Sequence, residues 1–309
     1  MKRLQQWYQG LITFKKSATH SPGFVLALGG GGSRGLAHLG VLEALEKHGL
    51  RPDAIVGTSI GALFGALYAI HGDVLEVRKR VEHFLNSESF SQLSLPPLTE
   101  AKLEDDSWMA KLGAAARHTL LYTKAATDIA LMDAAVLEGI IAEFCHDTHF
   151  ADTVIPLYIT GVSFPAGKCH VFHEGALTSA VSASMAIPGV FSPVVVDGVR
   201  YVDGGVAAEL PSLEAKNIAQ HQQIVVAVNV GAYPEPESEP EHIISMLDWT
   251  TMVKSYHLRQ FKYDYADVMI TPLVGTTQWH DFSHPEEEIR KGFDATEAQI
   301  PQLLAKLGR

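Results

Sequence analysis

Residues 24–35 read FVLALGGGGSRG, and residues 54–61 read AIVGTSIG. Each stretch begins with a short apolar run, which is typical of a strand buried on both faces of a parallel sheet. Each run leads into glycines and then into a segment with apolar residues at helical spacing. Two such strand–loop–helix units in succession predict an α/β fold, with a mainly parallel central sheet flanked by helices in three layers.

The remaining sequence continues this alternation between positions 157 and 307. We expect one domain over residues 22–309, with a helical insertion at about 74–150 that caps a site, and a basic, amphipathic extension over residues 1–21. Asp197-Gly198 between two short apolar runs predicts a hairpin. Further strands are expected at 157–164, 194–196, 200–202, 224–230 and 268–270, and helices at 36–48, 60–70, 74–85, 108–126, 134–144, 177–185, 243–263 and 285–307.

Composition excludes several classes of protein. The chain has 309 residues, 47% of them hydrophobic, so it has enough apolar material to fold, and its net charge of −11 disfavours nucleic acid as a partner. Two cysteines, Cys145 and Cys169, make no disulfide scaffold and indicate a reduced, cytoplasmic chain. The N-terminal segment is interrupted by glutamines and does not resemble a secretory signal, but its basic residues favour a transient contact with the inner membrane face.

Gly57-Thr58-Ser59-Ile60-Gly61 is a G-x-S-x-G sequence between an expected strand and an expected helix. In that context the pattern is typical of a nucleophile elbow, where a serine stands on a sharp turn with its hydroxyl exposed. The flanking glycines, Gly57 and Gly61, remove side chains that would clash in so tight a bend. The alternative is a glycine-rich packing turn.

Gly29–Gly35, the sequence GGGGSRG, allows two interpretations. Successive unhindered backbone N–H groups at a helix start can form the oxyanion hole of a hydrolase. The same residues match the dinucleotide fingerprint G-x-G-x-x-G, which requires an acidic residue at the end of the second strand. Asp53 lies at the start of that strand, and no Gly-Lys-Ser/Thr closes a phosphate loop. The first interpretation is therefore favoured.

A serine nucleophile needs a proton acceptor. None of the 15 histidines has a context that singles it out, although His280, Asp281 and His284 have a spacing that suits a metal. The proton acceptor can instead be a carboxylate. Asp203, in Asp203-Gly204-Gly205 at an expected strand end, is a candidate for this role, because desolvation would raise the pKa of its carboxyl. We expect no metal and no organic cofactor.

GGGGSRG, GTSIG, Ala183–Pro188 (ASMAIP) and Asp203-Gly204-Gly205 occur in this order over about residues 22–300. This arrangement resembles the patatin-like phospholipase family, particularly its bacterial members, and is similar to the catalytic domain of neuropathy target esterase. The resemblance implies a Ser–Asp dyad without a catalytic histidine. Ser59 would be the nucleophile and Asp203 the base.

The resemblance also implies roles for the neighbouring residues. Gly30, Gly31, Gly32 and Ser33 would supply the oxyanion hole. Arg34 and Gly35 would support that loop, with Arg34 also biasing the site toward anionic groups. Ser184 and Pro188 would belong to a structural block beside the site.

Two positions depart from the family pattern. Ser33 replaces a frequent alanine, and Glu209 replaces the asparagine that commonly follows the aspartate block. Glu209 either raises the pKa of Asp203 by charge repulsion or faces solvent.

These features predict a hydrolase that cleaves lipid or other acyl esters through an acyl-serine intermediate. Residues 86–130 would form an acyl-binding wall or lid, or ordinary core, through Leu93, Leu95, Leu98, Trp108 and Leu112. An acyltransferase with the same acyl-serine, a non-catalytic regulatory protein and, less well supported, a dinucleotide-binding oxidoreductase remain as alternatives.

Overall fold

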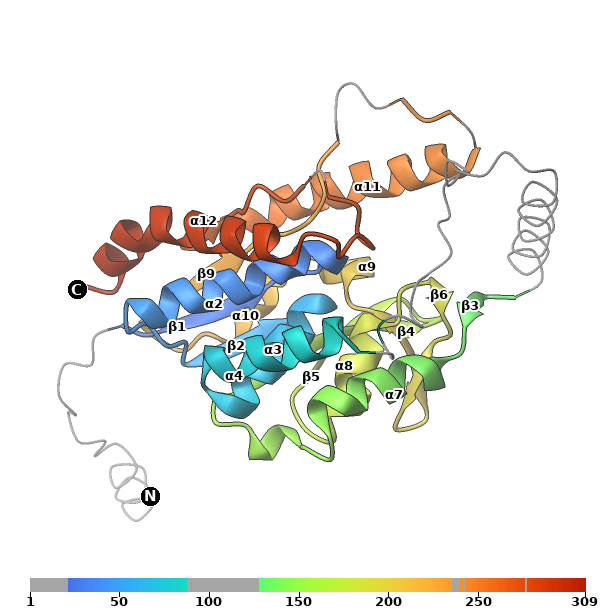
Figure 1. Ribbon diagram of the computed structural model, residues 1–309, viewed down its shortest axis with the longest axis horizontal. Helices are drawn as coiled ribbons and strands as arrows, with labels where there is room; N and C mark the ends of the chain where they lie inside the picture. The colour runs from blue at the N-terminus through green and yellow to red at the C-terminus, as the bar shows by residue number, and fades with distance from the viewer. Residues whose placement is uncertain (1–21, 88–89, 91–127, 235–238, 242, 276) are drawn as a thin grey trace, which may run out of the picture.

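The structure is a computed structural model that describes residues 22–87, 90, 128–234, 239–241, 243–275 and 277–309 (Figure 1). The expected N-terminal extension, the expected helix at 108–126 and the five apolar residues proposed for a lid lie outside the described residues. Among the described residues, no helix is both long enough and apolar enough to cross a membrane.

The central sheet has the strand order β10-β9-β1-β2-β4-β8-β7, with β5 also paired to β4. The first five strands of this order run parallel, while β8, β7 and β5 are antiparallel to their neighbours. The prediction of a mainly parallel sheet flanked by helices is confirmed. The strands are β1 (Phe24–Leu28), β2 (Ala54–Gly57), β4 (Leu157–Phe164), β5 (Lys168–Phe172), β7 (Val194–Val196), β8 (Val199–Asp203), β9 (Ile224–Val228) and β10 (Val268–Ile270).

Helices cover both faces of the sheet (Figure 1). Alternate residues of β1 show why: Leu26 belongs to a large core on one face, while Val25 and Ala27 belong to a smaller core on the other. Successive side chains of a strand point to opposite faces of the sheet. Because β1 carries apolar side chains on both faces, each face must be covered by a layer of helices. The larger core contains residues of α2 (Ala37–Lys47), α3 (Ile60–His71), α4 (Val74–Leu85), α7 (Ala134–Cys145), α8 (Leu177–Met185) and α12 (Pro285–Lys306), and the smaller contains residues of α10 (Ser212–Ile218).

The strand register places β2 and β8 end to end along one edge of β4. Gly57 at the end of β2 pairs with Ile159, and Asp203 at the end of β8 pairs with Gly161 two residues further along. Ile159 and Gly161 both also pair with β5, so β2 and β8 lie on the same edge of β4, opposite β5. Because β8 is antiparallel to β4, its last residue points toward the turn that follows β2.

Some elements were not anticipated. β5 begins with three exposed residues and has no apolar run, and β3 (Ala130–Met132) and β6 (Gly189–Phe191) are three-residue strands that pair with each other. Two further short helices that were not expected, α9 (Gly205–Ala208) and α10, follow the aspartate block.

Two other predictions are confirmed. The helix expected at 243–263 is present as α11 (Ile243–Lys262), and the hairpin predicted at Asp197-Gly198 connects β7 and β8.

Candidate active site

Ser59 stands on the turn between β2 and α3. Its backbone has φ 54° and ψ −125°, a conformation that costs an L-residue free energy and is concentrated at functional sites. The turn leaves no room for neighbouring side chains, because a Cβ on Gly61 would lie 2.3 Å from the carbonyl oxygen of Leu28 and one on Gly57 would lie 2.5 Å from the Cα of Ala62. The strand, turn and helix therefore have the backbone geometry of a nucleophile elbow.

Asp203 accepts a hydrogen bond from the Ser59 hydroxyl, with 2.7 Å between Oγ and Oδ2. Its other oxygen, Oδ1, accepts from the backbone N–H of Gly205 at 2.6 Å. Both side chains are almost completely buried. Desolvation raises the pKa of Asp203 to about 7, although the two hydrogen bonds favour its ionised form.

The end of α8 holds the serine and the aspartate in place. The Ser184 hydroxyl accepts from the backbone N–H of Ser59 at 2.8 Å, and the Ala186 carbonyl accepts from the N–H of Asp203 at 2.9 Å. The Ser184 carbonyl also accepts from the N–H of Gly204 at 3.3 Å. Ser184 therefore lies beside the dyad as the sequence suggested, while Pro188 lies between α8 and β6.

The glycine loop between β1 and the 3₁₀ turn η1 (Gly32–Leu36) lies against the elbow. A Cβ on Gly30 would be 3.3 Å from the Cβ of Ser59. The N–H of Gly30 already donates to the carbonyl of Glu209 at 2.8 Å, and the N–H of Ser33 donates to the carbonyl of Trp279 at 2.7 Å. In the described part of the chain, the N–H groups of Gly31 and Gly32 have no acceptor.

Arg34 connects the glycine loop to two other chain segments by hydrogen bonds. It is almost fully buried, and it donates from Nε to the carbonyl of Val230 at 3.1 Å and from Nη1 to that of Thr277 at 2.8 Å. Burial lowers the pKa of its guanidinium. The expected supporting role fits these contacts, which direct Nε and Nη1 at backbone carbonyls, while the expected bias of the site toward anionic groups stays a prediction. Gly35 lets the loop approach α3, since a Cβ there would be 2.3 Å from the Ile60 side chain.

Glu209 forms an ion pair with Arg259 of α11, with 2.5 Å between Oε2 and Nη1. The Glu209 side chain is 17% exposed and that of Arg259 is 4% exposed. Arg259 also donates to the carbonyl of Ala232. Of the two alternatives for Glu209, the structure favours a charge that acts on Asp203 over a side chain that simply faces solvent. Its charge raises the pKa of Asp203 as expected, but less than desolvation does.

His38 is a supporting residue whose role the sequence did not reveal. Its ring is fully buried, and burial lowers its pKa to about 4, so the imidazole is neutral near pH 7. Nε2 lies 2.8 Å from the carbonyl oxygen of Gly29, which an Nε2–H can therefore hold in place. Among the described residues, no histidine is bonded to the Ser59 hydroxyl, and no three His, Cys, Asp or Glu side chains are grouped to hold a metal.

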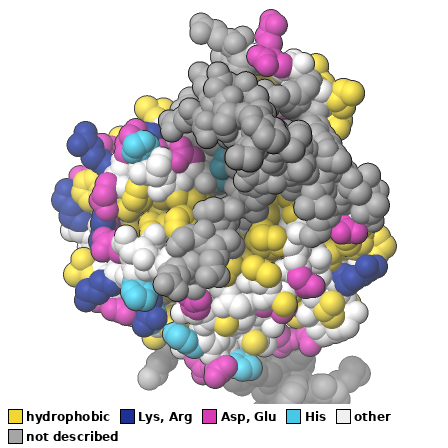
Figure 2. Space-filling view, turned by 45° about the vertical axis from the view of Figure 1, so that its right-hand side comes forward, with side chains coloured by type: hydrophobic (Ala, Val, Ile, Leu, Met, Phe, Trp, Pro, Cys, Tyr) yellow, Lys and Arg dark blue, Asp and Glu magenta, His cyan; other side chains and the backbone are white. Residues whose placement is uncertain are grey.

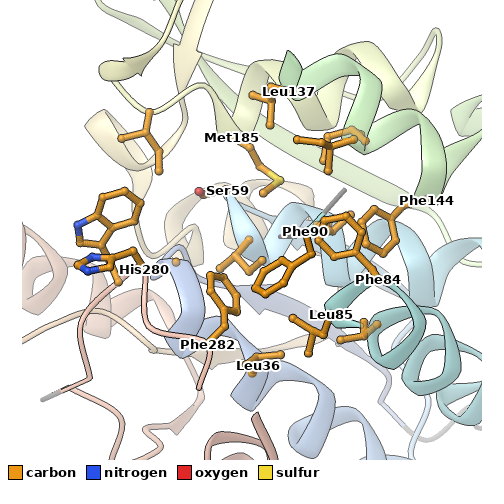
Figure 3. Close-up of a pocket in the computed structure, with 18 of the residues that line it drawn as sticks. Leu36, Ser59, Phe84, Leu85, Phe90, Leu137, Phe144, Met185, His280 and Phe282 are labelled. Carbon is orange, nitrogen blue, oxygen red and sulfur yellow. The ribbon is translucent and has the colours of Figure 1, made fainter. Parts of the chain in front are cut away.

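Ser59 lines a cavity of about 490 Å³ and lies between His280 on one side and Phe84 and Phe144 on the other (Figure 3). Apart from Ser59, its polar side chains are His280 and Ser283, and the rest of its described lining is apolar or glycine. The central part of the face in Figure 2 carries apolar side chains, with charged ones toward its edge. The walls include Phe64, Phe84, Leu137, Phe144, Met185 and Phe191.

The family model for patatin-like phospholipases matches residues 26–216. The chain belongs to the patatin-like phospholipase family. Its matched region contains the glycine loop, the elbow, the end of α8 and the aspartate at the end of β8. The fold and the order of these segments therefore follow a family pattern.

Among curated proteins, this patatin-like protein is 31% identical to lysophospholipase NTE1 of Eremothecium gossypii over 286 residues, which is 88% of this chain and 15% of that protein. It is 30% identical to an uncharacterized NTE family protein of Mycobacterium tuberculosis over 221 residues, 71% of this chain and 53% of that one. It thus spans only a small part of the fungal relative. VipD from Legionella pneumophila shares the fold, with a TM-score of 0.50, 15% identity, and coverage of 93% of this chain and 68% of VipD.

Proposed function

We propose that this protein is a serine lipid acyl hydrolase, of the phospholipase A, lysophospholipase or carboxylesterase type. The observation that carries the proposal is the 2.7 Å hydrogen bond between Ser59 and Asp203 on a strained elbow that opens into an apolar cavity. A hydroxyl bonded to a carboxylate at this distance is arranged for proton transfer. The curated lysophospholipase relatives support the same reaction class.

In the first step, Ser59 Oγ attacks the ester carbonyl carbon and its proton moves to Asp203 Oδ2. The carbonyl oxygen becomes an oxyanion as the C–O bond to Ser59 forms. The intermediate then expels the alcohol, which takes the proton from Asp203, and an acyl-serine remains. An Asp203 pKa of about 7 suits both proton transfers, because the group is a stronger base than an ordinary carboxylate and still ionises near neutral pH.

The oxyanion is stabilised by the N–H groups of Gly31 and Gly32. These two donors are free within the described chain, whereas those of Gly30 and Ser33 are committed to the carbonyls of Glu209 and Trp279. Of the four residues expected from the sequence to form the oxyanion hole, we therefore propose that only Gly31 and Gly32 donate to the oxyanion. His38 and Arg34 act as positioning residues, because each holds a carbonyl or a chain segment beside the loop.

In the second step, a water molecule gives a proton to Asp203 and attacks the acyl carbon. The proton returns to Ser59 Oγ as the C–O bond breaks, which releases a fatty acid and restores the hydroxyl. The acyl chain lies in the apolar cavity, where burial of its methylenes contributes binding energy. The polar part of the ester stays at the end near Ser59 and His280.

The proposal is tested by labelling the protein with an alkyl fluorophosphonate and reading the intact mass. We expect one adduct on the wild type, none on Ser59→Ala, and an unchanged single adduct on Ser283→Ala, which removes another hydroxyl from the same cavity. An adduct that persists on Ser59→Ala would refute the assignment. So would a folded wild type that stays unlabelled in buffer, in detergent and with phospholipid vesicles.

A further inference from the structure

A second cavity, of about 330 Å³, lies directly beside the first. Five residues line both: Val81, Leu85, Phe90, Phe282 and Ser283. A residue that lines two cavities separates them by the thickness of its own side chain. The two spaces are therefore divided by a partition of side chains, and its bulkiest members are aromatic.

The partition is built so that side-chain rotation can open it. The rings of Phe90 and Phe282 meet edge to face, with centroids 5.4 Å apart and planes at 84°, and Figure 3 shows them next to each other with Leu85 nearby. Phe90 also meets Phe84 edge to face at 5.6 Å. Phe90 and Phe282 are only partly buried, and the proposal below requires that their rings change rotamer.

The second cavity has a mixed lining, with apolar residues next to the shared wall and polar or charged residues, Glu82, Asn86 and Glu286, in the rest. Leu39, Pro285 and Ile289 add apolar surface to the shared wall, while Glu82 and Glu286 stand among the lining residues. Both carboxylates are paired with Arg78, at 3.2 Å and 2.9 Å, and that guanidinium is also paired with Glu43 at 2.7 Å.

Three carboxylates around one guanidinium leave a net negative charge beside the polar part of this lining. This charge repels the carboxylate or phosphate group of a lipid, so the part of a lipid that suits the apolar side of the cavity is its uncharged hydrocarbon end. An acyl chain held near Ser59 would reach it methyl end first, by passing from the first cavity through the partition.

We propose that the second cavity is a distal subsite for the methyl end of long acyl chains, and that Phe90 and Phe282 set the chain length the protein accepts. This inference rests on the proposed function, because it assumes that Ser59 reacts with an acyl or alkyl group held in the first cavity. The substrates it selects are esters of fatty acids too long for the first cavity alone. Each additional methylene that becomes buried raises the rate constant at low substrate concentration by up to about fourfold.

The experiment measures the second-order rate constant of Ser59 labelling with a series of linear alkyl fluorophosphonates of increasing chain length. In Phe282→Ala and Phe90→Ala the cavities merge, and 330 Å³ added to 490 Å³ increases the space by about two thirds. We expect the optimum to move to longer probes, with the ratio of long-chain to short-chain rates rising at least tenfold. Phe144→Ala, in the first cavity only, is the matched control and should shift the optimum much less.

A second arm fills the distal cavity instead of opening it. Asn86 lines only the second cavity and is exposed, so Asn86→Trp occupies that space without disturbing the core. On the wild type it should lower labelling by the longest probes about tenfold and leave short probes unchanged. Combined with Phe282→Ala, it should reverse the shift in the optimum.

The outcomes separate the two proposals. A wild type that no probe labels refutes the proposed function. A labelled wild type whose optimum is unmoved by Phe282→Ala and Phe90→Ala, or by Asn86→Trp, refutes the distal subsite and leaves the proposed function intact. The Asn86→Trp arm tests the inference even where an aromatic-to-alanine variant does not fold.

Discussion

The dyad and the cavity meet at Ser59 but are held by different means. Around the dyad, polar groups are fixed by the backbone: Asp203 Oδ1 by the N–H of Gly205, and Arg34 by two carbonyls. Around the cavity, apolar side chains from several segments contact one another without directional bonds. Backbone geometry tolerates almost no change, whereas apolar packing tolerates substitutions of equal volume.

The two regions also differ in the burial of charge. Asp203, Glu209 and Arg259 lie within or next to the dyad region and are nearly buried. The wall of the first cavity contains no Asp, Glu, Lys or Arg among its described residues. Electrostatic perturbation should therefore alter the chemistry strongly and the acyl-binding space very little.

Gly32→Ala is expected to have the largest effect, because it changes the oxyanion loop directly. Gly32 has φ +60°, and an added Cβ would lie 2.2 Å from the carbonyl oxygen of Trp279, so the loop must move. Loss of an oxyanion donor typically costs 10²–10³ in rate. We expect a fall of about that size in the rate constant of fluorophosphonate labelling.

The control for this variant is Gly49→Ala. Gly49 has φ +62°, but nothing lies within 4 Å of its added Cβ. Alanine there carries the same backbone penalty, about 1 kcal/mol in the free energy of unfolding, without touching the loop. Its labelling rate should match the wild type. An equal loss in both variants would show that the Gly32 effect is general destabilisation.

The next largest effect concerns pH. In the proposed mechanism Asp203 accepts the serine proton only when it is ionised, and burial raises its pKa to about 7. Lowering the pH through that value protonates the carboxyl, so the labelling rate should fall about tenfold per pH unit below 7 and level off above it. Stopped-flow labelling from pH 5 to pH 9 gives the profile. A rate that stays flat from pH 8 to pH 5 would assign Asp203 an ordinary carboxyl pKa and remove the physical reason for its role as base.

The sequence predicted the backbone-determined region well. The strands at Phe24–Leu28, Ala54–Gly57 and Leu157–Phe164 have the bounds expected from their apolar runs. Ser59 and Asp203 could be singled out as candidates because a sharp turn and a crowded strand end both favour glycines, and glycine positions are visible in a sequence. Their pairing as a dyad came from the resemblance to the patatin-like family and not from local steric rules, and their catalytic roles stay a prediction.

Contacts between distant segments were not predictable in the same way. The N–H of Ser33 is committed to the carbonyl of Trp279, and Glu209 is paired with Arg259, each through tertiary packing that local patterns do not encode. The cavity wall combines α4, α7, α8 and residues 279–283, and its apolar residues look like ordinary core in the sequence. The expected lid at 86–130 falls mostly outside the described residues and stays a prediction.

The smallest effects are expected at two adjacent residues of α8, one beside the dyad and one in the wall of the first cavity. They compare the two regions most directly. Ser184 accepts the N–H of Ser59 at 2.8 Å, while Met185 lines the cavity (Figure 3). Ser184→Ala leaves a buried N–H without its acceptor, a loss of about 1–3 kcal/mol. Because this hydrogen bond positions the backbone of Ser59, we expect its loss to lower the labelling rate about tenfold.

Met185→Leu keeps the volume and the apolar character of the side chain, so it should change the labelling rate by less than about threefold. Thermal unfolding of both variants separates a misplaced Ser59 from a less stable protein. If Met185→Leu were as damaging as Ser184→Ala, the cavity would be shaped as strictly as the elbow. The surface that binds the acyl chain would then be rigid. Such rigidity would contradict the proposal that rotation of the Phe90 and Phe282 side chains opens the partition between the two cavities.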